Sequence, residues 1–393
     1  MNIIFVHDHK IKVDLERKYY TDGKLTNELF QRYIFDQNDK IKAITRVVII
    51  EQHDTKTLNL VDHPNVFFNP VKGINPLQIF FRNCIYNTKI FKNFIKSDLN
   101  IIRLPSFIGL FCCFICILFR KKYFLELVGH ARDSLIDHNS SQLLILIAKI
   151  YSLFTKFVVK RAAGVIYVTK YALQKDYPTL GISAVASNVV IHIDEVDCPK
   201  IQYNVPSQRI FRIGLIGSFN NHYKGIEFAI NTIALLRKKN ISVNLHILGQ
   251  GSLLNEYIKL AHKLQVEDLI FFEGILPGGD PVKKWLDKLD LYIQPSLTEG
   301  LPRALIEAMS RGLPALASNV GGIPELLDSE YMFSSFDENI FANKILKFIQ
   351  DEKLRKVCGN NNYLKSKDYD FSKLESDRRE FWMACRNLLK EAS

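Results

Sequence analysis

Long apolar runs are scarce in this sequence. The most apolar stretch, residues 107–119, has thirteen residues and ends at Arg120-Lys121-Lys122, whereas a helix needs about 20 residues to cross a bilayer. The opening residues 1–6 meet His7-Asp8-His9 at once, without the long apolar core and cleavage site of a secretory leader. We therefore expect neither a leader nor a transmembrane span. Residues 107–119 form either a helix packed on a sheet or a helix lying in a membrane interface.

Signatures of nucleic-acid binding are also missing. The sequence contains no RNP-like, zinc-finger or helix-turn-helix pattern, although its formal net charge is +11. The charge is uneven: residues 1–205 carry 27 Lys and Arg against 18 Asp and Glu, and the remainder carries 25 against 23. A basic N-terminal half without a nucleic-acid motif favours an anionic membrane surface or an anionic substrate. We therefore expect no nucleic-acid partner.

Neither a metal site nor a disulfide framework is predicted. The seven cysteines include Cys113 and Cys116, a C-x-x-C pair with no second pair nearby. The cysteines are expected to be small buried hydrophobic residues in a reducing compartment. His7 and His9 flank Asp8, but the spacing supplies no third metal ligand. Internal repeats and low-complexity segments are not evident either.

What the sequence does contain is a repeated alternation of strands and helices. Its composition, 47% hydrophobic and 24% charged over 393 residues, suits two ordinary globular domains. The pattern predicts strands at residues 1–6, 46–50, 123–128, 164–169, 211–217, 243–248, 269–272 and 291–293, and helices at residues 25–35, 75–100, 107–119, 142–162, 225–238 and 373–390. This alternation indicates α/β domains with doubly wound parallel sheets.

The domain boundary is predicted in a polar segment, residues 194–209, which contains two prolines and shows no periodicity. The domains are then residues 1–205 and residues 206–372. The last helix, residues 373–393, either caps the second domain or crosses back to the first.

The most informative stretch follows the strand at residues 291–293. Pro302 suits the first position of a helix, and Gly312 suits its end. Glu299 lies on the loop before this helix, and Glu307 lies on the helix itself. A strand that leads into a helix N-terminus makes an anion seat, since free N–H groups point out of it. Phosphate would repel two carboxylates, so we expect these to hold hydroxyl groups. The site therefore suits a phosphate joined to a sugar.

Two weaker signals lie in the N-terminal half. The strand at residues 123–128 leads into Gly129-His130, which places His130 at the ligand edge of a parallel sheet, as a catalytic or a structural histidine. In the polar loop of residues 7–24, Gly23 stands before a helix. A single glycine there is a weak phosphate signal, and a surface turn explains it equally well.

Several short motifs follow one another in the C-terminal half. They are Gly217-Ser218-Phe219 with Lys224-Gly225, Gly249-Gln250-Gly251, Phe272-Glu273-Gly274, Pro295-Ser296, Glu299-x7-Glu307-Ala308-Met309, Gly312-Leu313-Pro314 and Gly321-Gly322-Ile323-Pro324-Glu325. In this order they resemble the retaining glycosyltransferases of family 4. The N-terminal half resembles the subgroup that builds bacterial capsule, O-antigen or exopolysaccharide repeat units, through His7-Asp8-His9, Tyr19-Tyr20, Arg103-Leu104-Pro105-Ser106, Val128-Gly129 and Val168-Thr169-Lys170-Tyr171.

The resemblance implies a GT-B fold, in which two Rossmann-like doubly wound parallel-sheet domains face a central cleft. A nucleotide-diphosphate sugar of the UDP or GDP type is then held mainly by the second domain. The donor-binding residues would be Gly23, Gly217, Ser218, Lys224, Gly274, Glu299, Gly300, Leu301, Arg303, Ala304 and Glu307. No metal is implied, and no cofactor besides this co-substrate.

The resemblance also implies separate roles within that set. Glu307 would bind the ribose hydroxyls, and Glu299 the hydroxyls of the transferred sugar. Lys224 would neutralise the diphosphate as it leaves. His130 would lie near the sugar, and with Glu299 and Lys224 it makes up the catalytic residues. The β-phosphate would meet the backbone N–H groups of Leu301, Arg303 and Ala304.

The implied activity is retaining transfer of a hexosyl unit to a glycan acceptor. The acceptor is expected to be lipid-linked, and the protein cytoplasmic or peripheral on the inner face of the cytoplasmic membrane. Two residues depart from the family pattern: Ser218 stands where many members have Arg, and Lys24 stands where a second glycine is common. Two alternatives stay open, a GT-B sugar-nucleotide epimerase and a non-catalytic partner in a polysaccharide assembly complex. The Glu299–Glu307 pattern argues against the epimerase.

Overall fold

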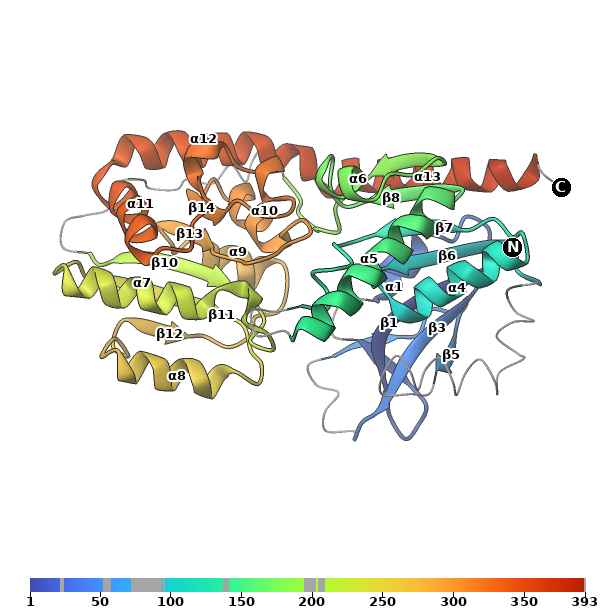
Figure 1. Ribbon diagram of the computed structural model, residues 1–393, viewed down its shortest axis with the longest axis horizontal. Helices are drawn as coiled ribbons and strands as arrows, with labels where there is room; N and C mark the ends of the chain where they lie inside the picture. Colours follow the sequence, from blue (N-terminus) through green and yellow to red (C-terminus); the bar gives the residue numbers. More distant parts are fainter. Residues whose placement is uncertain are drawn as a thin grey trace. The chain divides into compact units, whose positions relative to one another are not determined.

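The structure is a computed structural model that describes residues 1–21, 25–51, 58–71, 94, 96–136, 141–193, 203 and 209–391. The chain folds into two compact units (Figure 1). The first comprises Met1–Leu135, Gln142–Ala186 and Glu375–Ser393, and the second comprises Ile136–Ser141 and Ser187–Leu374. Most of the predicted helix at residues 75–100 and of the predicted linker at residues 194–209 lies outside the described residues.

The first unit is built on a sheet with nine strands in the described part of the chain. They are β1 (Asn2–Val13), β2 (Tyr19–Thr21), β3 (Lys40–Ile49), β4 (Asn59–Val61), β5 (Val66–Val71), β6 (Leu99–Leu104), β7 (Phe124–Leu127), β8 (Gly164–Tyr167) and β9 (Ile182–Val185). The order is β4-β2-β1-β6-β7-β8-β9, and β3 pairs with β1 and β5. Only β2 pairs antiparallel among these strands, with β1 and β4. The centre of the sheet is therefore parallel, with β1 between β3 and β6.

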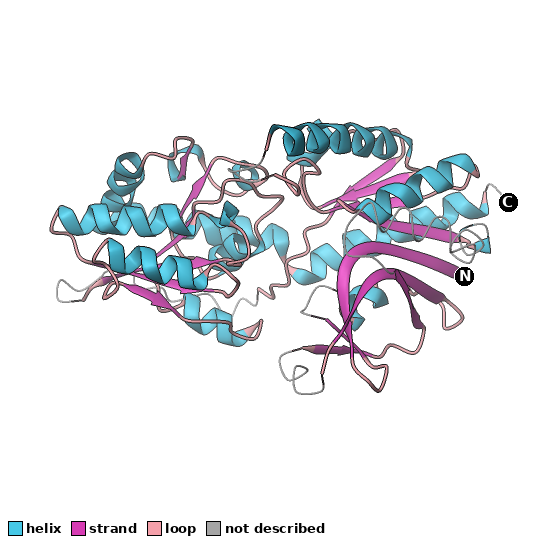
Figure 2. Cartoon of the chain, turned by 60° about the horizontal axis from the view of Figure 1, so that its bottom comes forward, coloured by secondary structure: helices cyan, strands magenta, loops and turns pink. Residues whose placement is uncertain are grey.

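Strand β1 is longer than the sequence predicts. The predicted polar loop from His7 to Lys24 is wrong in its first half, because the strand continues to Val13 and curves strongly (Figure 2). The register of β1 against β3 shifts between Val6 and Lys10, and pairing then resumes as far as Val13. An irregularity of this kind bends a strand. The resumed pairing with β3 keeps the backbone of residues 10–13 hydrogen-bonded.

The helices of the first unit are α1 (Asn27–Gln31), α4 (Phe107–Leu118), α5 (Gln142–Arg161), α6 (Ala172–Asp176) and most of α13 (Phe371–Lys390). Helix α4 confirms the predicted helix at residues 107–119, and it packs on β1 and β6 with most of its side chains buried. Helix α13 is fixed to the first unit by Trp382, whose ring lies 5.2 Å from that of Tyr33. Arg386 of α13 donates to Asp39 at 2.6 Å.

Helix α5 has a composition that the sequence analysis overlooked. It is the one described helix that is long and apolar enough to cross a membrane by length and composition, with a mean hydropathy of 1.7 over its best window. The expectation of no transmembrane span rests on residues 107–119 alone, which are more apolar but shorter.

The second unit is built on a parallel sheet of six strands in the described part of the chain, in the order β12-β11-β10-β13-β14-β15. The strands are β10 (Phe211–Ile216), β11 (Val243–Leu248), β12 (Ile270–Phe272), β13 (Leu291–Gln294), β14 (Ala315–Ser318) and β15 (Met332–Phe333). Its helices are α7 (Ile226–Lys238), α8 (Leu254–Lys263), α9 (Asp280–Leu286), α10 (Arg303–Ser310), α11 (Glu338–Gln350) and α12 (Glu352–Ser366). The α/β fold with parallel sheets in two domains is thus confirmed.

The strand order of the second unit places its candidate site. From β10 the chain adds β11 and β12 on one side, and then β13, β14 and β15 on the other. In open parallel sheets, ligands bind outside the carboxyl ends of the strands at such a switch point. Here the switch point lies between β10 and β13, where the loops of residues 217–225 and 295–302 leave the sheet.

Candidate active site

The two loops at the switch point are packed together. The backbone N–H of Leu297 donates to the carbonyl of Tyr223 at 2.7 Å, and the carbonyl of Pro295 leaves no room for a side chain at Gly225. Gly225 has a φ of 68°, a left-handed conformation that glycine adopts without strain. It allows the short 3-10 turn His222–Lys224 to pass directly into α7. Lys224 is therefore fixed beside the loop that follows β13.

The structure brings Lys224 and Glu299 into direct contact. The Nζ of Lys224 lies 2.6 Å from Oε1 of Glu299, and both side chains are largely buried, with exposed fractions of 16% and 9%. Gly217 forms the floor beneath Lys224, since a side chain at Gly217 would meet the aliphatic part of the lysine. Two predicted catalytic residues thus form one buried ion pair at the carboxyl edge of the sheet.

Two further side chains, which were not among the predicted site residues, hold Glu299, and a third holds one of these two. Gln294 donates to Oε1 of Glu299 at 3.0 Å, and Ser296 donates to the same oxygen at 2.7 Å. Tyr292 donates to the side-chain oxygen of Gln294 at 2.8 Å. Residues 292, 294 and 296 alternate along one face of the chain. Polar side chains at every second position of an otherwise apolar buried strand were the signal that could have revealed them.

These contacts all end on one oxygen of Glu299. Lys224, Gln294 and Ser296 each contact Oε1, and no hydrogen bond or ion pair within the described residues reaches Oε2. The carboxylate is therefore held in one orientation while Oε2 keeps its capacity to accept a hydrogen bond from a ligand.

Within the described residues, the N-terminus of α10 carries no side-chain cap. Pro302 occupies the N-cap position, one residue before the helix, so the sequence expectation that it is the first helical residue is off by one. The first N–H groups of a helix have no partner within the helix, and proline offers no side-chain acceptor for them. Gly312, with a φ of 65°, ends the helix as predicted. The first turn, which includes Arg303 and Ala304, thus keeps its anion-binding character.

Glu307 lies on the second turn of α10 and is half-buried. Burial raises the pKa of its carboxyl above that of a free glutamate, and the positive charge of Arg303 acts in the opposite direction. No hydrogen bond or ion pair to this carboxylate is present among the described residues. Burial also raises the pKa of Tyr292, and the charges of Glu299 and Glu307 add to this shift. Both carboxylates therefore lie close enough to the buried Tyr292 to act on the charge of its hydroxyl.

The remaining predicted donor residues lie on neighbouring loops of the same edge. The carbonyl of Gly300 accepts from Gly322 at 2.7 Å, and the carbonyl of Gly274 accepts from Gly249 at 2.6 Å. Leu301 is buried. Ser218 accepts hydrogen bonds from the backbone and side chain of Asn220 at 3.3 and 3.2 Å. The hydroxyl of Ser218 therefore makes its hydrogen bonds within its own loop. The predicted residues Gly23 and Lys24 lie outside the described residues.

His130 lies in the first unit, after β7, with two carboxylates around its ring. Its Nε2 is 3.2 Å from Asp176, and its Nδ1 is 3.7 Å from Asp133. The hydroxyl of Tyr177 lies 3.3 Å from Nδ1, and it also contacts Ser152 of α5 at 2.8 Å. The imidazole is therefore held in place by α5 and α6, and it remains partly exposed.

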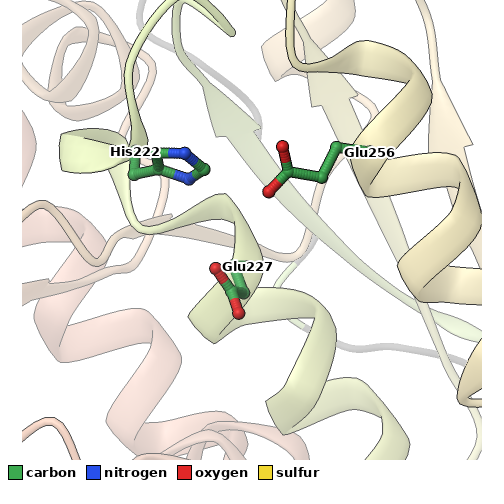
Figure 3. A group of neighbouring side chains, drawn as sticks. All are labelled: His222, Glu227 and Glu256. Carbon is green, nitrogen blue, oxygen red and sulfur yellow. The ribbon is translucent and has the colours of Figure 1, made fainter. Parts of the chain in front are cut away.

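One group of side chains near the site has the composition of a metal site. His222, Glu227 and Glu256 each offer one ligand atom, and these atoms lie within 4.8 Å of one another. Figure 3 shows the three side chains pointing toward one another from the turn after β10, from α7 and from α8. No sequence motif marks this group, because its members come from three separate elements. Both glutamates are exposed, which favours ordinary surface carboxylates over a built site.

The fold and the motifs at this edge define a family. Residues 210–365 match the family Glycosyl transferases group 1, and the chain belongs to these glycosyltransferases. Protein CapJ of Staphylococcus aureus is 30% identical over 409 residues, which covers 100% of this chain and 97% of CapJ. The amylovoran biosynthesis glycosyltransferase AmsK of Erwinia amylovora is 32% identical over 138 residues, which covers 33% of this chain and 34% of AmsK.

Solved structures confirm the GT-B fold. Sucrose-phosphate synthase from Thermosynechococcus elongatus has a TM-score of 0.69 at 16% identity and covers 100% of both chains. HepE of Anabaena, solved in complex with UDP and glucose, has a TM-score of 0.64 at 17% identity and covers 96% of this chain and 98% of HepE.

Proposed function

We propose that this glycosyltransferase is a retaining enzyme of family 4 that moves a hexosyl unit from a nucleotide-diphosphate sugar to a glycan acceptor. The observation that carries the proposal is the N-terminus of α10, which has no side-chain cap within the described residues, with one carboxylate on the loop before it, Glu299, and one on the helix itself, Glu307. A helix N-terminus attracts phosphate, and carboxylates accept hydrogen bonds from sugar hydroxyls. Together these groups suit a diphosphate between two sugars, as in a UDP- or GDP-sugar.

In this proposal each group acts on a defined part of the donor. Glu307 accepts from the ribose hydroxyls, and Oε2 of Glu299 accepts from the hydroxyls of the transferred sugar. The bond between C1 of that sugar and the β-phosphate oxygen breaks, and negative charge collects on the diphosphate. The first turn of α10 and the Nζ of Lys224 stabilise this charge, so the proposed reaction has no obligatory metal or cofactor.

The acceptor hydroxyl then bonds to C1 on the face that the diphosphate leaves. Its proton passes to the departing phosphate oxygen, which makes the leaving group the base for the attack. The anomeric configuration of the sugar is thereby retained. His130 is assigned a place near the transferred sugar on the family resemblance, and the paired Asp176 would keep its ring oriented.

The acceptor is proposed to be a lipid-linked glycan of a bacterial surface polysaccharide, such as a capsule, an O-antigen or an exopolysaccharide. Two relatives support this class: CapJ, which matches along the whole chain, and AmsK, which is named for amylovoran biosynthesis. The basic excess of residues 1–205 suits work beside an anionic membrane surface. The protein is then cytoplasmic or peripheral on the inner face of the membrane.

The test is incubation of the full chain with a panel of UDP- and GDP-hexoses, followed by NMR detection of released sugar. One donor should be hydrolysed slowly, with unchanged configuration at C1 in the first-formed product. Lys224→Ala should reduce this hydrolysis by about 10²–10³-fold, the usual effect of removing one group that stabilises developing charge. Lys283→Ala, which removes a partly exposed lysine paired with the exposed Asp280, is the matched control.

Three outcomes would overturn the proposal. An inverted product excludes the retaining mechanism, and a donor returned as a different sugar identifies an epimerase. Failure of every nucleotide sugar to bind in calorimetry identifies a non-catalytic protein. Circular dichroism of each variant separates a lost role from a lost fold.

A further inference from the structure

Helix α5 has one buried face and one unusually apolar exposed face. Its inward side chains, including Tyr151 and Val158, are buried against the first unit. The outward face carries Leu143, Leu146, Ile147, Ile150, Leu153, Phe154 and Phe157, all of them exposed large hydrophobic side chains. Leu153 is 66% exposed and Leu146 is 53% exposed. Soluble proteins rarely expose a continuous apolar stripe of this length without a partner.

The charges on α5 are of one sign. The helix contains no acidic residue, and Lys149, Lys156 and Lys160 are exposed. Each lysine follows an outward hydrophobic residue by three positions, which places the three in a row along one flank of the apolar stripe. Arg161 lies over the ring of Phe157, with its guanidinium carbon 3.8 Å from the ring centre. Apolar side chains beside a row of lysines are typical of helices that lie in a membrane interface.

The end of α4 extends this surface. Figure 1 shows α4 and α5 next to each other, and Phe114 of α4 packs against Phe154 and Phe157 of α5 at 5.7 and 6.0 Å. One turn beyond Phe114, Leu118 is 75% exposed, and the basic residues Arg120, Lys121 and Lys122 follow. Most of α4 is buried, so the sequence hypothesis of an interfacial helix at residues 107–119 survives only at the C-terminal end of that helix.

We propose that the outward face of α5, with the end of α4, docks on an anionic phospholipid bilayer. The apolar stripe enters the boundary between headgroups and acyl chains, and the lysines contact lipid phosphates. The helix lies in the interface and does not span, because its inward side chains remain packed on the first unit. Ser152, for example, contacts Tyr177 at 2.8 Å.

Charge decides between a bilayer and a second copy of the chain. A symmetric dimer through this face would bring the same patch of both copies together, and their lysines would then repel one another. An anionic bilayer supplies both a large apolar phase and the opposite charge. The observations therefore favour lipid.

Docking would also connect the membrane to a predicted catalytic residue. The inward face of α5 contacts Tyr177 through Ser152, and Tyr177 contacts His130 at 3.3 Å. The two faces of one helix thus serve the membrane and the side chain that was predicted to lie near the sugar. A lipid-linked acceptor held in the bilayer would then approach the first unit on the side of this helix.

Binding of the full chain to vesicles tests the proposal without any donor, so its failure would leave the proposed transfer reaction untouched. The probe is phosphatidylcholine vesicles with and without phosphatidylglycerol, in a sedimentation assay. The chain should bind the anionic vesicles in low salt.

Leu146→Gln with Leu153→Gln should weaken binding at least about tenfold, because two leucines lose apolar burial. Lys156→Gln with Lys160→Gln should weaken binding several-fold in low salt, and less in about 1 M salt, where charges are screened.

The matched control is Leu364→Gln, which changes an exposed leucine (62% exposed) on α12 of the second unit and should leave binding unchanged. Exposed positions are chosen so that the variants keep their fold, which thermal unfolding verifies. Equal binding by the leucine variant and the parent would overturn the proposal. So would concentration-dependent dimers in ultracentrifugation that the same variant abolishes, since the face would then join two copies.

Discussion

The two units present a helix N-terminus at equivalent places of their sheets, and they treat it in opposite ways. In the first unit β1 lies between β3 and β6, and α4 follows β6. In the second unit β10 lies between β11 and β13, and α10 follows β13. At α4, Ser106 accepts from the N–H of Gly109 at 2.8 Å. Asp8 accepts from the N–H groups of Phe107 and Ile108 at 2.5 and 3.2 Å. In the part of the chain that the structure describes, no side chain caps α10.

This difference explains where an anionic ligand can bind. A helix N-terminus stabilises one negative group at its first turn. In the first unit the carboxylate of Asp8 already occupies that position, delivered by the extended strand β1. In the second unit Pro302 leaves the position open, and Lys224 lies close by in its pair with Glu299. The diphosphate of the donor is therefore expected at the second unit.

The comparison is tested most directly by giving the N-terminus of α10 a carboxylate of its own. Pro302→Asp places a carboxylate at the N-terminus of α10, where Asp8 places one for α4. We expect kcat/KM for the donor to fall at least about a hundredfold, because like charges at a buried contact cost several kcal/mol. The folded state should be stabilised by about 1 kcal/mol through the new cap. Steady-state kinetics and thermal unfolding measure the two effects.

Pro302→Ala is the control for this variant, since it removes the proline without adding an acceptor. It should keep most of the activity. If Pro302→Asp were stable and fully active, the phosphate would not lie at α10, and the assignment of the donor site would be wrong.

Glu307→Gln should raise KM for the donor about tenfold and change kcat little, because a ribose contact contributes to donor binding in the ground state as well. The effect has a pH signature. Burial raises the pKa of Glu307, and the ionised form accepts the ribose hydroxyls. KM of the parent should therefore rise as pH falls through this raised pKa, and KM of the variant should not.

The same shift sets the sign of the stability change. A carboxyl whose pKa is raised by folding stabilises the fold below its unfolded pKa, and this contribution is lost as pH rises through the folded pKa. The parent therefore loses stability as pH rises through this raised pKa, whereas Glu307→Gln does not, so the variant should unfold at an equal or higher temperature above that pH. A variant with unchanged KM and lower stability would make Glu307 a structural residue.

Removing the carboxylate that caps α4 tests the other half of the comparison. Asp8→Ala leaves the N–H groups of Phe107 and Ile108 without their acceptor, and it should cost about 1–2 kcal/mol of stability. Urea unfolding followed by circular dichroism measures this loss. Asp328→Ala, which removes an exposed carboxylate that makes no cap hydrogen bond, should cost little. An unchanged midpoint for Asp8→Ala would mean that Ser106 alone caps α4.

Particular residues show what could be predicted from the sequence. The apolar strand Leu291–Gln294, the proline at position 302 and Gly312 each have strong local preferences, and the structure confirms a strand, a loop and a helix there. The hydrogen bonds of Gln294 and Ser296 to Glu299 depend on how the loop folds back on the strand. The cap that Asp8 gives to α4 joins residues almost a hundred positions apart. Such contacts are set by tertiary packing, which local preferences do not encode.

The smallest expected effect concerns Ser218, where many family members have Arg. Among the described residues, its hydroxyl accepts two long hydrogen bonds, both from Asn220 in an exposed turn, so replacing it should cost little. Ser218→Arg should lower KM for the donor by about two- to fivefold in low salt, the range of an exposed ion pair. Ser218→Gln, which adds length without charge, should not. The gain should disappear in about 1 M salt, where the Debye length is about 3 Å. An unchanged KM in low salt would mean that the side chain at position 218 does not approach the phosphate. The phosphate-binding groups would then be the first turn of α10 and Lys224.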